Sequence, residues 1–218
     1  MGEPTSNKKV ADSARIGRRG SLGGHLQIFG KQGHVAYPEN VENPIFLSSD
    51  LITDLKNKKW DNGNAIFDPT SFQISNIHSG TGAHNVVPGE LDLYFNFRYS
   101  TESTEESLKS EFENIIKNLN LKYDLKWSLN GNPYLTENKF LKEIIVSACE
   151  EVNGYKPDLN AKGGTSDGRF IAKMKTEIIE LGPINESIHQ IDENIKISEL
   201  WILKDIYTKV LFKLNQHL

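Results

Sequence analysis

Four segments of this 218-residue sequence combine glycine with charged or polar side chains that could bind or activate a ligand. Two adjacent arginines can grip a carboxylate in a fork geometry, and glycines before a helix N-terminus expose backbone N–H groups that favour an anion. A histidine that follows glycine at a strand end can donate a hydrogen bond to a developing oxyanion. The segments are Gly17-Arg18-Arg19-Gly20-Ser21, Gly33-His34-Val35-Ala36-Tyr37-Pro38, Gly163-Gly164-Thr165-Ser166-Asp167-Gly168-Arg169 and residues 181–189.

Each of these segments also has a plainer interpretation. The arginine pair could be a solvated basic turn, His34 a surface histidine, and residues 163–169 an ordinary helix cap. His189 follows a predicted strand end, where α/β sheets place ligands, so it could be a metal ligand, an acid/base or a structural histidine. Asn85 fits a turn as well as a ligand contact. The residue types alone leave these alternatives open.

The composition excludes several classes of protein. The 25 basic and 29 acidic residues give a net charge of −4, which argues against a nucleic-acid partner. No run of about 18 apolar residues is present, so we expect no membrane span, and the first residues lack the pattern of a secretory signal. The single cysteine, Cys149, rules out an internal disulfide and fits a buried thiol in a reducing compartment. We therefore expect a soluble, cytoplasmic protein with neither a nucleic-acid nor a membrane partner.

Residues 22–128 predict the element order β-α-β-β-α-β. Alternating apolar residues from Leu91 to Phe97 are the clearest strand signal. A capping box formed by Ser103 and Glu106 predicts the start of the second helix. Two helices on one face of a four-stranded antiparallel sheet make a ferredoxin-like domain. We expect the strands over 25–31, 71–77, 90–99 and 121–128, and the first helix over 43–57.

Beyond the turn at Asn130-Gly131-Asn132-Pro133 the pattern becomes α/β. About two strands are predicted there, whereas a parallel sheet covered on both faces needs more. We therefore expect this part to belong to a larger domain. The expected elements are helices over 137–152, after Ser166-Asp167 and over 198–214, and strands over 157–161 and 177–181. The last helix should face inward with Leu200, Leu203, Tyr207, Val210, Leu211 and Leu214.

Together with Gly2-Glu3-Pro4-Thr5-Ser6 and Asn85-Val86-Val87-Pro88, the four segments resemble the two-zinc amidohydrolases. This family includes desuccinylases, aminoacylases, acetylornithine deacetylase and glutamate-releasing carboxypeptidases. The double arginine and the run from Gly164 to Phe170 resemble the desuccinylases in particular, whereas His84 stands where the pattern has asparagine. The resemblance implies a mixed α+β and α/β fold: a catalytic segment (1–18), a ferredoxin-like lid and dimerisation domain (19–129), and the C-terminal part of an α/β zinc-hydrolase domain (130–218).

The resemblance also implies roles for individual residues. Glu3 and His189 match ligands of two different zinc ions, for which cobalt could substitute. His34 matches a lid histidine that reaches the partner subunit's active site and stabilises the oxyanion, which implies a homodimer. The positions that match substrate-binding residues are Arg18, Tyr37, Asn85, Arg98, Gly164, Thr165 and Asn185.

The implied reaction is hydrolysis of N-succinyl-LL-2,6-diaminopimelate to succinate and LL-2,6-diaminopimelate, in lysine and cell-wall precursor biosynthesis, by a water that two zinc ions activate. The resemblance further implies an upstream half that carries a histidine ligand, a bridging aspartate and a Glu-Glu pair. These 218 residues begin after it, so we expect this chain to be inactive alone. An acetylornithine deacetylase-like or other related deacylase, and a non-catalytic dimerisation or binding module, remain open as alternatives.

Overall fold

The computed structural model describes residues 1–216, and the chain divides into two compact units, which are described separately. Unit 1 comprises Met1–Arg19 and Pro133–Leu218, and unit 2 comprises Gly20–Asn132. Within residues 1–216, none of the helices combines the length and apolar character needed to cross a lipid bilayer.

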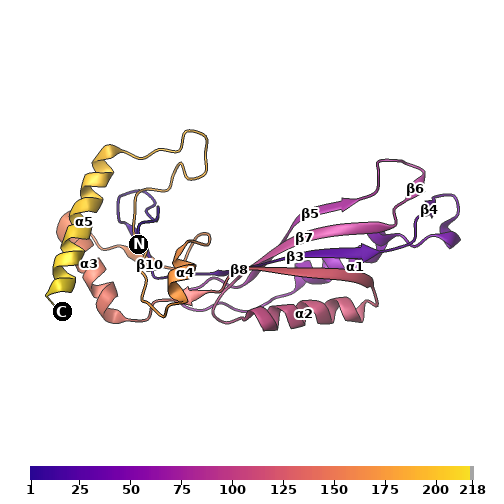
Figure 1. Ribbon diagram of the computed structural model, residues 1–218, viewed down its shortest axis with the longest axis horizontal. Coiled ribbons are helices and arrows are strands. Elements are labelled where there is room, and N and C mark those ends of the chain that lie inside the picture. The colour runs from indigo at the N-terminus through magenta and orange to yellow at the C-terminus, as the bar shows by residue number, and fades with distance from the viewer. Residues whose placement is uncertain (217–218) are drawn as a thin grey trace. The chain divides into compact units, whose positions relative to one another are not determined.

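Unit 2 is built on a four-stranded antiparallel sheet in the order β5-β7-β3-β8. Two helices lie on one face of this sheet (Figure 1). The ferredoxin-like prediction, and with it the mixed α/β fold class, is therefore confirmed. The strands are β3 (Gly20–Phe29), β5 (Ser71–Ser79), β7 (Glu90–Tyr99) and β8 (Lys122–Gly131), and the helices are α1 (Pro44–Asn57) and α2 (Glu105–Asn118). A 3-10 turn η1 (Pro38–Asn40) and two short strands, β4 (Gly33–His34) and β6 (Val86–Val87), complete the unit.

One apolar core fills the space between the sheet and its two helices. Alternate residues of β7 are buried, as the sequence pattern predicts, and α2 contributes the apolar stripe of Leu108, Phe112 and Ile116. Phe95 stacks on Phe112 with ring centroids 4.5 Å apart. A Cβ at Gly24 would lie 2.2 Å from the Phe95 ring, so this strand position must be glycine for the ring to pack against the sheet.

The capping box of α2 lies one residue later than predicted. The Thr104 hydroxyl accepts a hydrogen bond from the Ser107 N–H (3.1 Å), and the Ser107 hydroxyl accepts one from the Thr104 N–H (3.0 Å). The Ser103 hydroxyl instead donates to Asp61 at 2.7 Å. The box predicted from Ser103 and Glu106 is therefore wrong, because a distant carboxylate engages Ser103.

In its described part, up to residue 216, unit 1 contains short strands and three helices. Strand β1 (Ser13–Arg15) pairs in parallel with β10 (Asp158–Asn160), and β2 (Gly17–Arg18) pairs with β9 (Tyr134–Leu135). Helix α3 (Lys139–Asn153) packs against α5 (Ile197–Asn215), and α4 (Gly168–Ala172) is a five-residue turn of helix (Figure 1).

Two expectations for unit 1 are wrong, the second only in part. In place of the strand predicted over 177–181, the structure has only an isolated bridge between Glu180 and Arg15. Beside this bridge the Met1 amino group donates to the carbonyl of residue 179, and the Met1 carbonyl accepts from the N–H of residue 181. The inward face predicted for α5 is only partly right: Leu203 and Val210 are buried as predicted, but Leu200 and Leu211 are 48% and 67% exposed, and Glu199 and Ile206 are buried in their place. Apolar residues surround this helix on several sides, so their spacing does not determine which face packs.

Candidate functional site

The loops that carry Glu3 and Asn185 are held together by backbone hydrogen bonds. The Ser6 N–H donates to the Pro183 carbonyl (3.1 Å), and the Asn185 N–H donates to the Ser6 carbonyl (3.0 Å). A Cβ at Gly182 would lie 2.1 Å from the Glu3 carbonyl oxygen. Glycine at position 182 therefore permits the close approach of two loops whose sequence positions are far apart.

Glu3 is a half-buried carboxylate in unit 1. Burial raises its pKa, and Glu180 and Asp167 raise it further, whereas Arg18 partly opposes them. Such surroundings disfavour an isolated negative charge, so a nearby cation would stabilise the ionised side chain. Two hydrogen bonds hold the loop: Arg15 Nη2 donates to the Thr5 carbonyl (3.0 Å), and the Gly182 N–H donates to the Thr5 hydroxyl (3.1 Å).

His189 lies in an exposed turn with a left-handed backbone (φ 60°). Its N–H donates to the Glu193 carboxylate at 3.2 Å. Among residues 1–216, no group of three or more His, Cys, Asp or Glu side chains is arranged to hold a metal ion. The assignment of Glu3 and His189 as metal ligands therefore stays a prediction.

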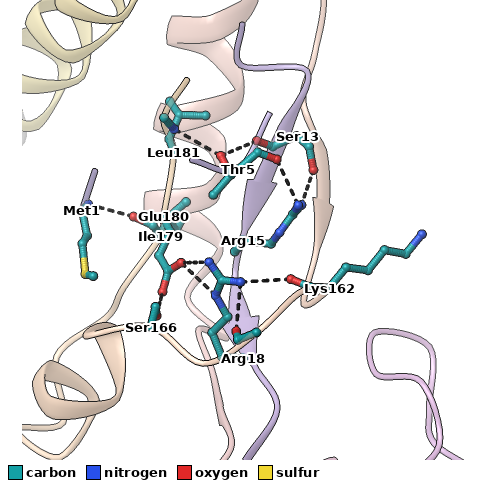
Figure 2. A network of polar contacts seen from close by, with 12 residues as sticks. Met1, Thr5, Ser13, Arg15, Arg18, Lys162, Ser166, Ile179, Glu180 and Leu181 are labelled. Carbon is teal, nitrogen blue, oxygen red and sulfur yellow. Dashed lines mark hydrogen bonds and ion pairs between the residues drawn. The ribbon is translucent and has the colours of Figure 1, made fainter. Parts of the chain in front are cut away.

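Arg18 is buried, and a carboxylate of the protein occupies its fork of donors (Figure 2). Its Nε donates to Glu180 at 2.8 Å, and its Nη2 donates to the same oxygen. Ser166 and Tyr134 donate their hydroxyls to the other oxygen. Burial, and then the hydrogen bond to Glu180, raise the pKa of Tyr134. In this structure Glu180 thus engages the fork of the arginine, and the assignment of Arg18 as a substrate-binding residue stays a prediction.

Gly164 and Thr165 lie in the loop that precedes α4, where Thr165 is half-buried. Arg18 Nη1 donates to the carbonyls of Lys162 and Gly164, each at 3.1 Å. The loop that carries Gly164 and Thr165, two predicted substrate-binding residues, is thus bonded to Arg18, a third.

Unit 2 brings together three of its four predicted site residues. His34 in β4 pairs with Val86 in β6, and the Val35 N–H donates to the Asn85 carbonyl at 3.1 Å. The Tyr37 N–H donates to the His34 carbonyl (3.0 Å), and the two rings are 5.8 Å apart. His34, Tyr37 and Asn85 therefore form one exposed cluster.

The exposed His34 ring has a defined acceptor side. Its Nδ1 lies 3.0 Å from the Ala36 N–H and accepts a hydrogen bond from it. In the neutral imidazole this leaves the proton on Nε2, which is then a donor. Arg98 is separate from this cluster. It lies near the far end of β7, eight residues after Glu90, the first residue of that strand, and eight strand residues span about 27 Å.

The model of the peptidase dimerisation domain, M20_dimer, matches residues 16–124. The chain belongs to this family. Two curated relatives are similar along almost the whole chain. A succinyl-diaminopimelate desuccinylase of Hydrogenovibrio crunogenus is 51% identical over 215 residues, and one of Pseudomonas syringae pv. syringae is 50% identical over 214. Each match covers 98% of this chain but 57% of the relative, so the chain spans little more than half the length of these proteins.

Solved structures share the fold at low sequence identity. A metallo-carboxypeptidase from Sulfolobus solfataricus aligns with a TM-score of 0.80 and 16% identity, covering 100% of this chain and 63% of that one. Aminopeptidase PepT from Bacillus cereus aligns with a TM-score of 0.78 and 20% identity, covering 96% and 56%.

The sequence analysis did not identify Glu180, the carboxylate that pairs with Arg18. One signal was available, since Glu180 is a charged residue inside the apolar run Ile178-Ile179-Glu180-Leu181. A carboxylate flanked by buried residues needs partners of its own, and that need indicates a polar network. Cys149, by contrast, is a buried free thiol. Burial raises its pKa to about 11, which keeps the thiol protonated and inert.

Proposed function

We propose that this chain supplies the dimerisation unit and part of the catalytic unit of a succinyl-diaminopimelate desuccinylase. The observation that carries the proposal is the 51% and 50% identity to two curated desuccinylases over 98% of the chain. The reaction would be hydrolysis of N-succinyl-LL-2,6-diaminopimelate to succinate and LL-2,6-diaminopimelate in the cytoplasm. The acetylornithine deacetylase-like alternative has no comparable support in the named relatives.

The donor chemistry of unit 1 fits a share of a zinc or cobalt site. Glu3 offers a carboxylate and His189 an imidazole, and hydrogen bonds tie the loop of Glu3 to the segment that leads to His189. Bound zinc would polarise the amide carbonyl and lower the pKa of a bound water. Because a zinc ion normally has three or four protein ligands, the proposal assigns the remaining ligands of both ions to residues outside these 218.

His34 would stabilise the oxyanion. Its Nδ1 accepts the Ala36 N–H, so its Nε2–H is the group available to donate to a negative oxygen as that charge develops. The neighbouring Tyr37 and Asn85 would orient the substrate. Its carboxylates and amide would be contacted by Arg18, Arg98, Gly164, Thr165 and Asn185. The family name supports a homodimer formed through unit 2.

A chimera tests the activity. The part of the Hydrogenovibrio crunogenus relative that has no counterpart here is joined in front of Met1 of this chain. We expect the chimera to hydrolyse N-succinyl-LL-2,6-diaminopimelate in a zinc- or cobalt-dependent way, and the 218 residues alone to be inactive. Hydrolysis of N-acetylornithine in preference to the succinyl substrate would contradict the proposal.

The role of His34 is tested in the same chimera. His34→Asn should lower kcat about 100-fold, because one oxyanion donor is lost. His78→Asn, a change at another exposed histidine of unit 2, is the matched control and should leave kcat unchanged. Sedimentation of the 218 residues tests the dimer, and a monomer at high micromolar concentration would contradict that part.

A further inference from the structure

Glu180 is a fully buried carboxylate to which the predicted site gives no role. It accepts four hydrogen bonds. Two come from Arg18 in β2 and one from Ser166 ahead of α4 (Figure 2), and the fourth comes from Tyr134 in β9. Its own backbone is held as well, since its N–H and carbonyl both bond to Arg15 at 2.9 Å. Glu180 therefore has one fixed position and connects three segments of unit 1.

The donors of Arg18 are nearly all used by this arrangement. A guanidinium has five N–H groups. One on Nε and one on Nη2 go to Glu180, and the two on Nη1 go to the carbonyls of Lys162 and Gly164. Counting the bonds within residues 1–216, a single N–H on Nη2 is left for a ligand, so Arg18 can give a bound carboxylate one hydrogen bond and no bidentate grip.

Two glycines show how closely the loop is fitted to this pair. Gly163 has φ +98°, and a Cβ there would lie 2.8 Å from Arg18 Nη1. A Cβ at Gly168 would lie 2.7 Å from the Glu180 carboxylate and 2.3 Å from the Tyr134 hydroxyl. The loop between them is thus fastened at its start by Arg18 and near its end through Ser166.

We propose that Glu180 is a positioning residue that sets the geometry of the substrate-carboxylate subsite, an inference that rests on the proposed function. Glu180 holds Arg18 so that its one remaining N–H has a fixed direction, and it holds Ser166 so that Gly164 and Thr165 keep their places. Because Glu180 also balances the charge of Arg18, recognition of a substrate carboxylate depends on the direction of hydrogen bonds more than on net charge.

The chimera described above tests this through the split between KM and kcat. Glu180→Asp keeps the charge but shortens the side chain, so it cannot reach Arg18 and Ser166 together. We expect KM for the succinyl substrate to rise about 10-fold, with kcat within threefold of the parent. Glu177→Asp is the matched control, because this exposed residue lies on the same segment, and it should change neither constant. An unchanged KM, or a loss confined to kcat, would overturn the proposal.

Ser166→Ala is a gentler variant that removes one hydrogen bond to Glu180 and keeps the ion pair. We expect it to raise KM about fivefold, the effect of one lost hydrogen bond.

Hydrogen exchange of the 218 residues provides a readout that does not need activity. Glu180→Asp and Ser166→Ala should speed exchange of the amides at 163–168 at least fivefold and leave those of β7 unchanged. If the parent chimera is inactive, the proposed function fails. Unchanged exchange in both variants would instead overturn the positioning role of Glu180.

Discussion

The two units of this chain bury different kinds of side chain. Unit 2 has a single apolar cluster, including Phe95, Phe97 and Phe112, between one sheet and two helices. Among residues 1–216, the buried charged side chains all belong to unit 1: Arg15, Arg18, Glu180 and Glu199. Helix α5 of unit 1 meanwhile leaves Trp201 and Phe212 64% and 66% exposed.

This difference indicates what each unit tolerates. An apolar core accepts other apolar side chains of similar volume, because its attraction has no direction. A buried charge is stable only with its partner in place, since an uncompensated charge in the interior is costly. Unit 1 should therefore be sensitive to the identity of a few polar residues, and unit 2 to the volume of its core residues.

Breaking the buried ion pair should give the largest effect. Arg18→Leu leaves the Glu180 carboxylate buried with only two hydroxyl donors. We expect the free energy of unfolding of unit 1 to fall by about 4 kcal/mol. Hydrogen exchange of α3 peptides measures unit 1, and β7 peptides report unit 2 separately. Arg18→Lys should also cost unit 1 stability, because an ammonium cannot replace the four-bond geometry.

Arg19→Leu is the control for that experiment. Arg19 is half-exposed, and within residues 1–216 its side chain has no ion pair or hydrogen bond. We expect a change below about 0.5 kcal/mol, as for ordinary surface substitutions. A loss equal to that of Arg18→Leu would mean that stability follows the total basic charge of the turn rather than the buried pair.

A cavity in unit 2 should have the next largest effect. Phe112→Ala removes a ring that touches Phe72, Phe95, Phe97 and Trp127, and should lower the free energy of unfolding of unit 2 by about 3 kcal/mol. Phe112→Leu keeps most of the volume and should cost about 1 kcal/mol. Urea titration, with hydrogen exchange of β7 peptides as the probe of unit 2, measures the loss in both variants. If Phe112→Leu were as harmful as Phe112→Ala, the volume rule for this core would be wrong.

The same contrast explains what the sequence could and could not predict. Strand β7 was predicted with its observed ends, because one buried face imposes an alternation on adjacent residues. Strand β1 was missed, because three residues are too few to show a pattern. The partner of Arg18 lies 162 positions away, and no local pattern encodes such a pair. The cluster of His34 and Asn85 was foreseen only as separate motifs, since the pairing of β4 with β6 brings them together.

Asp61 is the exception in unit 2, a carboxylate that organises two loops. Burial alone would raise its pKa, but hydrogen bonds from Thr70, Ser103 and Gly63 outweigh burial and lower the pKa to about 2. Because 2 lies below the reference value of 3.8, the stabilisation is complete above about pH 4 and is lost as the pH falls through 2. Asp61→Asn should cost unit 2 about 2 kcal/mol at pH 7. Acid titrations should show a smaller loss of stability between pH 4 and 2 in the variant than in the parent, and equal slopes would contradict this.

The smallest effect distinguishes two candidate caps of α2. Thr104→Ala removes the hydroxyl that accepts the Ser107 N–H, and should lower the free energy of unfolding of unit 2 by about 1 kcal/mol. Glu106→Ala removes the exposed carboxylate of the box predicted from sequence, and only its weak attraction to the helix N-terminus is lost, about 0.3 kcal/mol. Urea titration of the two variants side by side measures the difference. The reverse ranking would mean that the helix starts one residue earlier in solution, with Ser103 released from Asp61. The loss on Asp61→Asn would then shrink as well, because one of the donors that stabilise that carboxylate would be gone.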